Sequence, residues 1–352
     1  MQSVAEKRNL RQVGIWLLIG VAMIMIQVLL GGITRLTESG LSITEWKPIT
    51  GALPPMNDAQ WMAEFNKYKY TDQFRHIHAD FTLADFKSIF FWEWFHRVWA
   101  RLMGVVFLIG FVYFLVKKKF NKEMVIPMII LFLLGALQGA IGWFMVKSGL
   151  LPEKLFVGHI ELTTHFIAAL MLQVYTFWFA LGLLIDRKNI TSSRGLHNII
   201  SIIIAVLFIQ LIYGGFMAGL KAATAAPTWP DINGALLPHG IKILSPWWHN
   251  LTDNKITVQL IHRSIAYLLL VLVTIFYIKS KDINNSSLFS NIKWLPLTLV
   301  ILQIALGILT VVNSTNTKAL IGLGIAHQFT GMLLVLSMVL MLFLIRRGRV
   351  NN

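Results

Sequence analysis

The apolar residues of this 352-residue chain fall in long runs separated by short polar or charged segments. A helix needs about 20 consecutive apolar residues to cross the hydrocarbon core of a bilayer. Only 13% of the residues are charged, against roughly a quarter in a soluble domain. The chain is therefore predicted to be an all-α integral membrane protein. Eight transmembrane helices are expected, at residues 13–33, 95–116, 125–146, 157–184, 196–217, 260–279, 294–313 and 320–345.

The net charge of +15 would suit a nucleic-acid-binding protein, but the basic residues lie in short clusters between the apolar runs. Such clusters mark the cytoplasmic side of a membrane protein. Sixteen of the 31 Lys and Arg residues lie within residues 7–11, 117–122, 187–194, 279–293 and 346–349. We therefore exclude nucleic acid and expect a multi-pass protein of the cell inner (plasma) membrane with both termini cytoplasmic. The segments 34–94 and 218–259 are expected to form structured caps on the outer side. There is no cysteine, which excludes disulfides and thiolate metal sites.

The two halves of the sequence repeat one another. Gln27 matches Gln210 at an offset of 183 residues, and Gly31-Gly32 matches Gly214-Gly215 at the same offset. Further matches are His96-Arg97 with His262-Arg263, Leu137-Gln138 with Leu302-Gln303, and His165 with His327. Four spans per half make both halves cross the membrane in the same sense, so the symmetry axis should follow the membrane normal. We predict two tandem four-helix bundles related by pseudo-twofold symmetry, residues 1–190 and 191–352.

Four of the ten histidines obey this repeat. Each half presents two imidazoles from two helices at a similar depth, and a haem held between facing helices of a bundle needs such a pair. The alternative for a single histidine near a span end is an interfacial or packing role, which we keep for four histidines of the outer loops and for one at the cytoplasmic entry of the fifth span. Those five are His76, His78, His197, His239 and His249. His159 shares a span with His165 but matches Ile321, so its role stays open.

The residues around the repeated histidines carry charge. Arg97 and Arg263 follow two of them and suit pairing with haem propionates, or alternatively snorkelling to lipid headgroups. Glu93 lies one helical turn before His96, whereas the matching residue before His262 is Gln259. A carboxylate near the hydrocarbon boundary is a functional candidate; the alternative is that Glu93 sits in headgroup water and pairs with Arg97. We therefore assign the chemistry to the first half.

These motifs resemble the heme A synthase family over nearly the whole chain. The resemblance is carried in the first half by residues 31–37, 39–41, 46–55, 93–97, 137–139 and 164–165, and in the second half by residues 214–215, 218–220, 259–263 and 326–328. It implies an oxidoreductase of cytochrome oxidase assembly that oxidises the C8 methyl of haem O to a formyl group, giving haem A. This cysteine-free sequence resembles the proteobacterial and mitochondrial group.

The resemblance also implies a ligand set. His262 and His327 would ligate the iron of a haem b with Arg263 nearby, His96 and His165 with Arg97 would bind the substrate haem, and Glu93 would be the essential acid. Expected partners are haem O, the lipid bilayer, haem O synthase and a separate electron donor, with a homo-oligomer compatible with the sequence. Two other classes remain open: a non-catalytic di-haem electron carrier or quinol oxidoreductase subunit, and a duplicated transporter. Transporters usually break spans at the midplane, whereas the repeated polar residues here cluster near one face.

Overall fold

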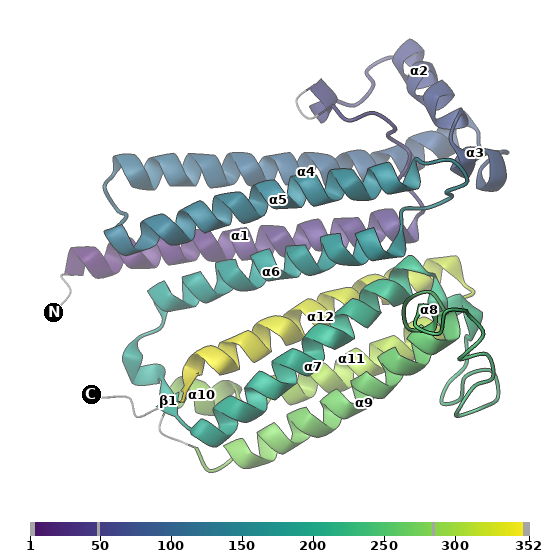
Figure 1. Cartoon of the computed structure of the whole chain (residues 1–352). Helices are drawn as coiled ribbons and strands as arrows, with labels where there is room; N and C mark the ends of the chain where they lie inside the picture. Colours follow the sequence, from purple (N-terminus) through teal and green to yellow (C-terminus); the bar gives the residue numbers. More distant parts are fainter. Residues whose placement is uncertain (1–3, 48–49, 284–285, 348–352) are drawn as a thin grey trace. The chain divides into compact units, whose positions relative to one another are not determined.

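The computed structural model describes residues 4–47, 50–283 and 286–347, and it is almost entirely helical (Figure 1). Eight helical segments in this part of the chain are long and apolar enough to cross a membrane. They are α1 (Val4–Leu36), α4 (Leu83–Val116), η2 with α5 (Lys122–Met124 and Val125–Gly149), α6 (His159–Leu184), α7 (Arg194–Gly219), α9 (Lys255–Ser280), α10 with α11 (Ser287–Ile292 and Leu295–Val312) and α12 (Thr317–Leu344). The predicted all-α fold with eight spans is confirmed.

The short elements lie between these helices, except for one strand that follows the last of them. They are η1 (Thr50–Ala52), α2 (Asp58–Lys69), α3 (Asp72–Ile77), η3 (Arg187–Asn189), β1 (Thr191–Ser192), η4 (Ala222–Ala225), α8 (His249–Thr252) and β2 (Ile345–Arg346). The two strands pair in parallel, so that Thr191 lies opposite Ile345.

The second span begins well before its predicted start at residue 95. Thr82 caps α4, accepting from the backbone N–H of Asp85 while the Asp85 side chain accepts from the Thr82 N–H. This capping box satisfies two N–H groups that would otherwise lack partners at the helix start. The helix has 34 residues and so is about 51 Å long, against roughly 30 Å for the hydrocarbon core. The helix is therefore longer than one crossing of the hydrocarbon core requires.

The chain divides into two compact units, residues 22–172 and residues 1–21 with 173–352. In the second of these, α7, α9, α11 and α12 pack side by side as a bundle, each contacting two of the others (Figure 1). Its core is apolar and includes the fully buried Ile200, Ile203, Phe276 and Met338. The pseudo-twofold relation between two bundles, and the functional division at residue 190, remain predictions.

In the unit of residues 22–172, the expected structured cap includes two helices. The helix α2 packs on the N-terminal part of α4 through an aromatic cluster that contains Phe65, Tyr68 and Phe86, all nearly inaccessible to solvent, and α3 packs on α2. The rings of Phe65 and Tyr68 both stack on Phe86, with centroids 5.1 and 5.4 Å away. This packing fixes the cap on the same helix that carries Glu93 and His96.

Candidate functional site

The C-terminal histidine pair, His262 of α9 and His327 of α12, lies inside the α7–α9–α11–α12 bundle. The two ring centroids are 6.4 Å apart and the rings are inclined at 68°. Two imidazoles that bind one iron from opposite sides through Nε2 need centroids roughly 6 Å apart, given metal–nitrogen bonds of about 2 Å. The spacing therefore fits a shared iron.

The hydrogen bonds of His327 favour Nε2 as the ligating nitrogen. Its Nδ1 lies 3.0 Å from the backbone oxygen of Gln303, to which it donates. An imidazole that donates from Nδ1 keeps the lone pair on Nε2, which is how ligating histidines are commonly oriented. On the other ring, Nδ1 of His262 is buried without a hydrogen-bond partner among the described residues. The donor set of two neutral imidazoles fits haem iron.

The N-terminal histidine pair, His96 of α4 and His165 of α6, belongs to the unit of residues 22–172. The side-chain amide nitrogen of Gln27 lies 3.1 Å from Nε2 of His96, and Nδ1 of His165 is a buried atom without a hydrogen-bond partner in the described chain. The structure thus brings His262 and His327 together, and it places His96 and His165 in one unit. Within the described ranges, no group of three or more His, Asp or Glu side chains is arranged to hold a metal ion.

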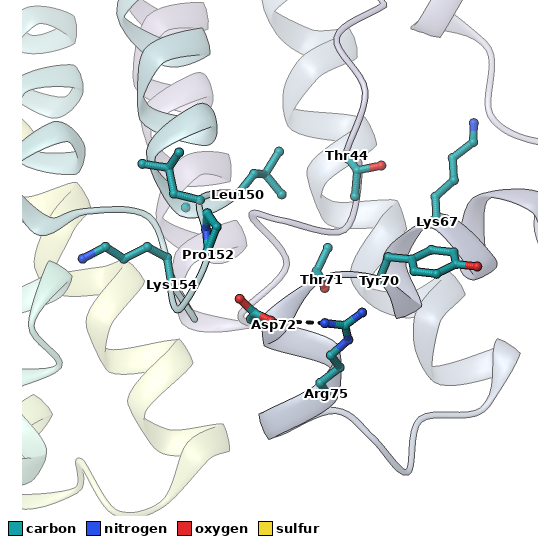
Figure 2. Close-up of a pocket in the computed structure, with 11 residues that line it drawn as sticks. Thr44, Lys67, Tyr70, Thr71, Asp72, Arg75, Leu150, Pro152 and Lys154 are labelled. Atoms are coloured by element: carbon teal, nitrogen blue, oxygen red, sulfur yellow. Dashed lines mark ion pairs between the residues drawn. The ribbon is translucent and has the colours of Figure 1, made fainter.

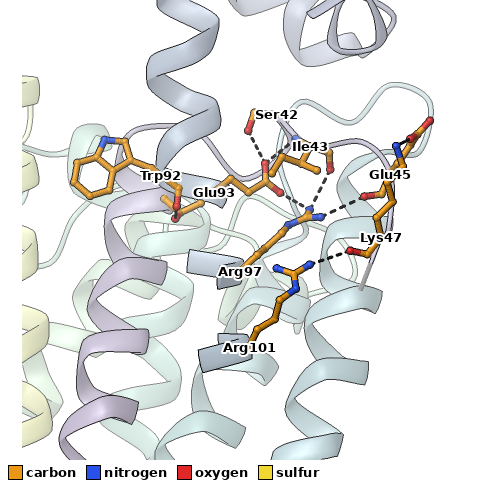
Figure 3. Close-up of polar contacts among 9 residues, drawn as sticks. Ser42, Ile43, Glu45, Lys47, Trp92, Glu93, Arg97 and Arg101 are labelled. Carbon is orange, nitrogen blue, oxygen red and sulfur yellow. Dashed lines mark hydrogen bonds and ion pairs between the residues drawn. The ribbon is translucent and has the colours of Figure 1, made fainter. Parts of the chain in front are cut away.

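Glu93 is the centre of a buried cluster, the Glu93 cluster, with Arg97, Ser42 and Ile43 (Figure 3). Its side chain is 3% exposed. One carboxylate oxygen accepts from the Ser42 hydroxyl at 2.7 Å and from the Ile43 backbone N–H at 2.8 Å, and the other pairs with the Arg97 guanidinium. The carboxylate is therefore matched by a cation and two further donors, and it is shielded from solvent. Pairing with Arg97 in headgroup water, the alternative from the sequence, is half right: the pair exists but it is buried.

Both repeated arginines donate to backbone carbonyls of the loop that precedes their helix in the same half. Arg97 donates to the carbonyls of Ile43 and Glu45 at 3.0 and 3.4 Å. Arg263 donates in the same way, to the carbonyls of Thr228 and Asp231 at 2.7 and 2.9 Å. The sequence offered propionates or lipid headgroups as partners and missed this contact. Each arginine thus ties an outer loop to the helix that bears a repeated histidine.

The position that matches Glu93 keeps the tethering role without the charge. Gln259 is fully buried, and its amide nitrogen donates to the backbone oxygen of Ala222 in η4 at 3.1 Å. In the second half the Gln259 side chain donates to a carbonyl. In the first half the Glu93 side chain accepts from a hydroxyl and a backbone N–H. The Glu93/Gln259 difference noted in the sequence is a difference in hydrogen-bond polarity as well as in charge.

The outer cap contains a second buried polar group. The Tyr68 hydroxyl contacts Nδ1 of His78 at 2.6 Å and donates to Gln73 at 3.0 Å, and burial raises the pKa of Tyr68. His78 also stacks on Phe81, with ring centroids 3.9 Å apart. The packing role expected for His78 agrees with these contacts.

A cavity of about 470 Å³ opens on the same unit, between the cap and the α5–α6 connection (Figure 2). Its charged lining residues are Lys67, Asp72, Arg75 and Lys154, and Asp72 pairs with Arg75 at 3.7 Å. Lys67 is paired with Glu64, which raises the pKa of Lys67. None of the four repeated histidines lines this cavity.

The fold and the two histidine pairs define a multi-pass membrane protein with paired imidazoles suited to haem. The sequence matches the family COX15-CtaA, described as cytochrome oxidase assembly protein, over residues 14–339, and the chain belongs to this family. Similar proteins called heme A synthase include one from Rhodopseudomonas palustris (strain HaA2), 41% identical over 95% of this chain and 92% of its own length. Another, from Flavobacterium psychrophilum, is 41% identical over 93% of this chain and 96% of its own length.

Proposed function

We propose that this chain is a heme A synthase, an oxidoreductase that converts the C8 methyl of haem O into a formyl group and so makes haem A for cytochrome oxidase assembly. The observation that carries this function is the pair of histidines in each half of a COX15-CtaA family chain whose relatives bear that name. The methyl carbon loses two hydrogens, gains one oxygen and is oxidised by four electrons. Two successive hydroxylations and loss of water meet this balance, with the oxidant and an electron donor supplied from outside the chain.

The C-terminal histidine pair would hold haem b. Its ring separation of 6.4 Å and the Nδ1 hydrogen bond of His327 support this role. Bound there, haem b would supply electron transfer. His262 and His327 would hold it through their imidazole nitrogens, and Arg263 holds the outer loop of this half against α9.

The N-terminal histidine pair would bind the substrate, haem O. Arg97 joins the helix of His96 to the loop at residues 43–45, and Glu93 lies one turn before His96 on that helix. A buried carboxylate in this place can accept a proton or stabilise positive charge that develops on the methyl carbon. The neutral Gln259 in the other half supports placing the chemistry in the first half.

The membrane setting follows from the eight spans and the basic clusters. We infer a protein of the cell inner membrane with both termini cytoplasmic and with residues 34–94 and 218–259 on the outer side. Haem O synthase would supply the substrate, and the lipid bilayer surrounds the apolar helix faces. A homo-oligomer is compatible with this arrangement.

The proposed function is tested by purifying the protein and identifying its extracted haem by mass spectrometry. Haem A or haem O together with haem B is the expected result. Haem B alone would refute the enzyme and favour a di-haem electron carrier. The same preparation from cells that lack haem O synthase is the control, because it should lose haem A and haem O but keep haem B.

A further inference from the structure

Each of the four repeated histidines lies against a glycine on another helix of its half. A Cβ atom added to Gly31 would meet Cε1 of His96 at 3.2 Å, and one added to Gly142 would meet Cε1 of His165 at 3.0 Å. In the second half the corresponding distances are 3.5 Å from Gly214 to His262 and 3.0 Å from Gly307 to His327. The glycine is always on the earlier helix and the histidine on the next spanning helix: α1 and α4, α5 and α6, α7 and α9, α11 and α12.

A glutamine precedes each of these glycines by four residues. The four are Gln27, Gln138, Gln210 and Gln303. Residues four apart lie one above the other on a helix, so the glutamine and the glycine share a face. Three of the four amide nitrogens contact Nε2 of the facing histidine, at 3.1 Å for Gln27, 3.4 Å for Gln210 and 3.2 Å for Gln303.

We propose that Gln-x-x-x-Gly is a histidine seat that occurs four times in this chain, and that its glutamine and glycine are positioning residues for the haem-ligating imidazoles. The inference rests on the proposed function, because it takes these histidines as haem ligands. Glycine leaves room for the edge of the ring. An amide N–H can only donate, so its contact with Nε2 keeps the ring proton on Nδ1 and leaves on Nε2 the lone pair that iron would take in place of the amide.

His327 has the most complete seat. Its Nδ1 donates to the backbone oxygen of Gln303, and its Nε2 faces the Gln303 side-chain amide. Gln303 thus contacts both ring nitrogens, one through its backbone oxygen and the other through its side-chain amide. Gly307 leaves room for the ring. Hydrogen bonds to the non-ligating nitrogen fix the tautomer and rotation of a ligating imidazole.

The seat also extends the internal repeat. Each half contains two seats on successive helix pairs, and each seat presents one imidazole. A two-histidine site therefore consists of two copies of one helix-pair element, and the whole chain contains four. Each half of the sequence repeat therefore contains two copies of a smaller unit, a pair of helices with one seat.

The distances from the added Cβ atoms to the histidine rings predict which glycine substitutions should disturb the C-terminal haem site. At Gly307 an added methyl group would sit 3.0 Å from the His327 ring, so the ring would have to shift by a few tenths of an ångström, whereas at Gly214 the distance of 3.5 Å is ordinary van der Waals contact. Gly322 on α12 has no neighbouring atom within 4 Å of the added carbon. Gly307→Ala should therefore disturb the site, and Gly322→Ala should not.

The experiment compares the purified full-length variants with the unaltered chain by haem b content and by the electron paramagnetic resonance spectrum of the low-spin haem. Gly307→Ala should weaken haem b binding about 10- to 100-fold, the usual effect of a change next to a metal ligand. Gln303→Leu keeps the apolar stem, and should retain haem b with shifted g-values.

Unchanged haem content and g-values in both Gly307→Ala and Gln303→Leu would overturn the inference, and so would equal loss of haem from Gly322→Ala. His327→Ala separates this failure from failure of the proposed function. If His327→Ala keeps its low-spin haem b, the ligand assignment itself is wrong. If His327→Ala loses haem while the seat variants match the unaltered chain, only the seat is wrong.

Discussion

Replacing Glu93 by glutamine tests whether the buried carboxylate acts in the reaction or only anchors the outer loop. Glutamine keeps the size and one acceptor oxygen, but it removes the charge opposite Arg97. Removing one partner of a buried ion pair costs about 3–5 kcal/mol. Arg97 still has the carbonyls of Ile43 and Glu45, so we expect the lower end, about 3 kcal/mol.

The effect on the reaction should be larger than this loss of stability. General acid–base catalysis contributes about 10²–10⁴ in rate, so Glu93→Gln should lower conversion of haem O to haem A by at least about 100-fold. Haem b in the other half should be retained, because His262 and His327 are unchanged. The assay is haem extraction from cells that make each variant together with haem O synthase.

Ser42→Ala is the matched control, because it removes one hydrogen bond of 2.7 Å to the same carboxylate and leaves the charge. It should cost about 1.5–3 kcal/mol of stability, as for hydrogen bonds to charged groups, and should retain most of the haem A yield. Normal haem A yield from Glu93→Gln would refute the catalytic assignment. Equal loss of yield in both variants would instead make Glu93 a loop anchor.

Three further predictions concern ligation, the outer cap and topology. His262→Ala and His327→Ala should each lose low-spin haem b in reduced-minus-oxidised spectra, and full six-coordinate spectra in both would exclude that ligation. Tyr68→Phe should lower stability by about 1–3 kcal/mol in thermal unfolding, because His78 and Gln73 lose their buried hydroxyl partner, whereas Tyr70→Phe at a 77% exposed side chain should change nothing. A reporter active only in the cytoplasm should be silent when fused within residues 218–259; an active fusion would reverse the topology.

The spans were predictable because each depends on a local property, a run of apolar residues long enough for the bilayer. The start of α4 was missed because residues 83–94 mix aromatic and charged side chains, and so do not read as membrane sequence. The Thr82–Asp85 capping box was a visible signal for the earlier start. The strands β1 and β2 have two residues each and pair across more than 150 positions, so no local pattern could indicate them.

The histidine pairs were accessible from the sequence because duplication places matching residues in matching positions. The loop partners of Glu93, Ser42 and Ile43, were not, since Ser42 lies 51 residues away in a loop whose path depends on packing of the cap. The carbonyl partners of Arg97 and Arg263 were missed for a related reason: a backbone oxygen carries no residue-type signal. The shared offset of Gln27 and Gln210 was noted in the sequence, but their contact with histidines needed coordinates.

The reverse substitution, Gln259→Glu, tests whether the second half tolerates a carboxylate at the position that matches Glu93. The Gln259 amide donates to the Ala222 carbonyl at 3.1 Å, and an ionised carboxylate there would turn lone pairs toward lone pairs. In the first half the carboxylate accepts from the Ser42 hydroxyl and the Ile43 N–H, whereas η4 presents a carbonyl to the matching position. We therefore expect Gln259→Glu to lose about 1–3 kcal/mol of stability and to add no haem A synthesis. Gln259→Met is the control that removes the donor without adding charge, and thermal unfolding should rank Gln259→Glu below it. A Gln259→Glu protein as stable as the unaltered chain would show that hydrogen-bond polarity at η4 does not keep this half neutral.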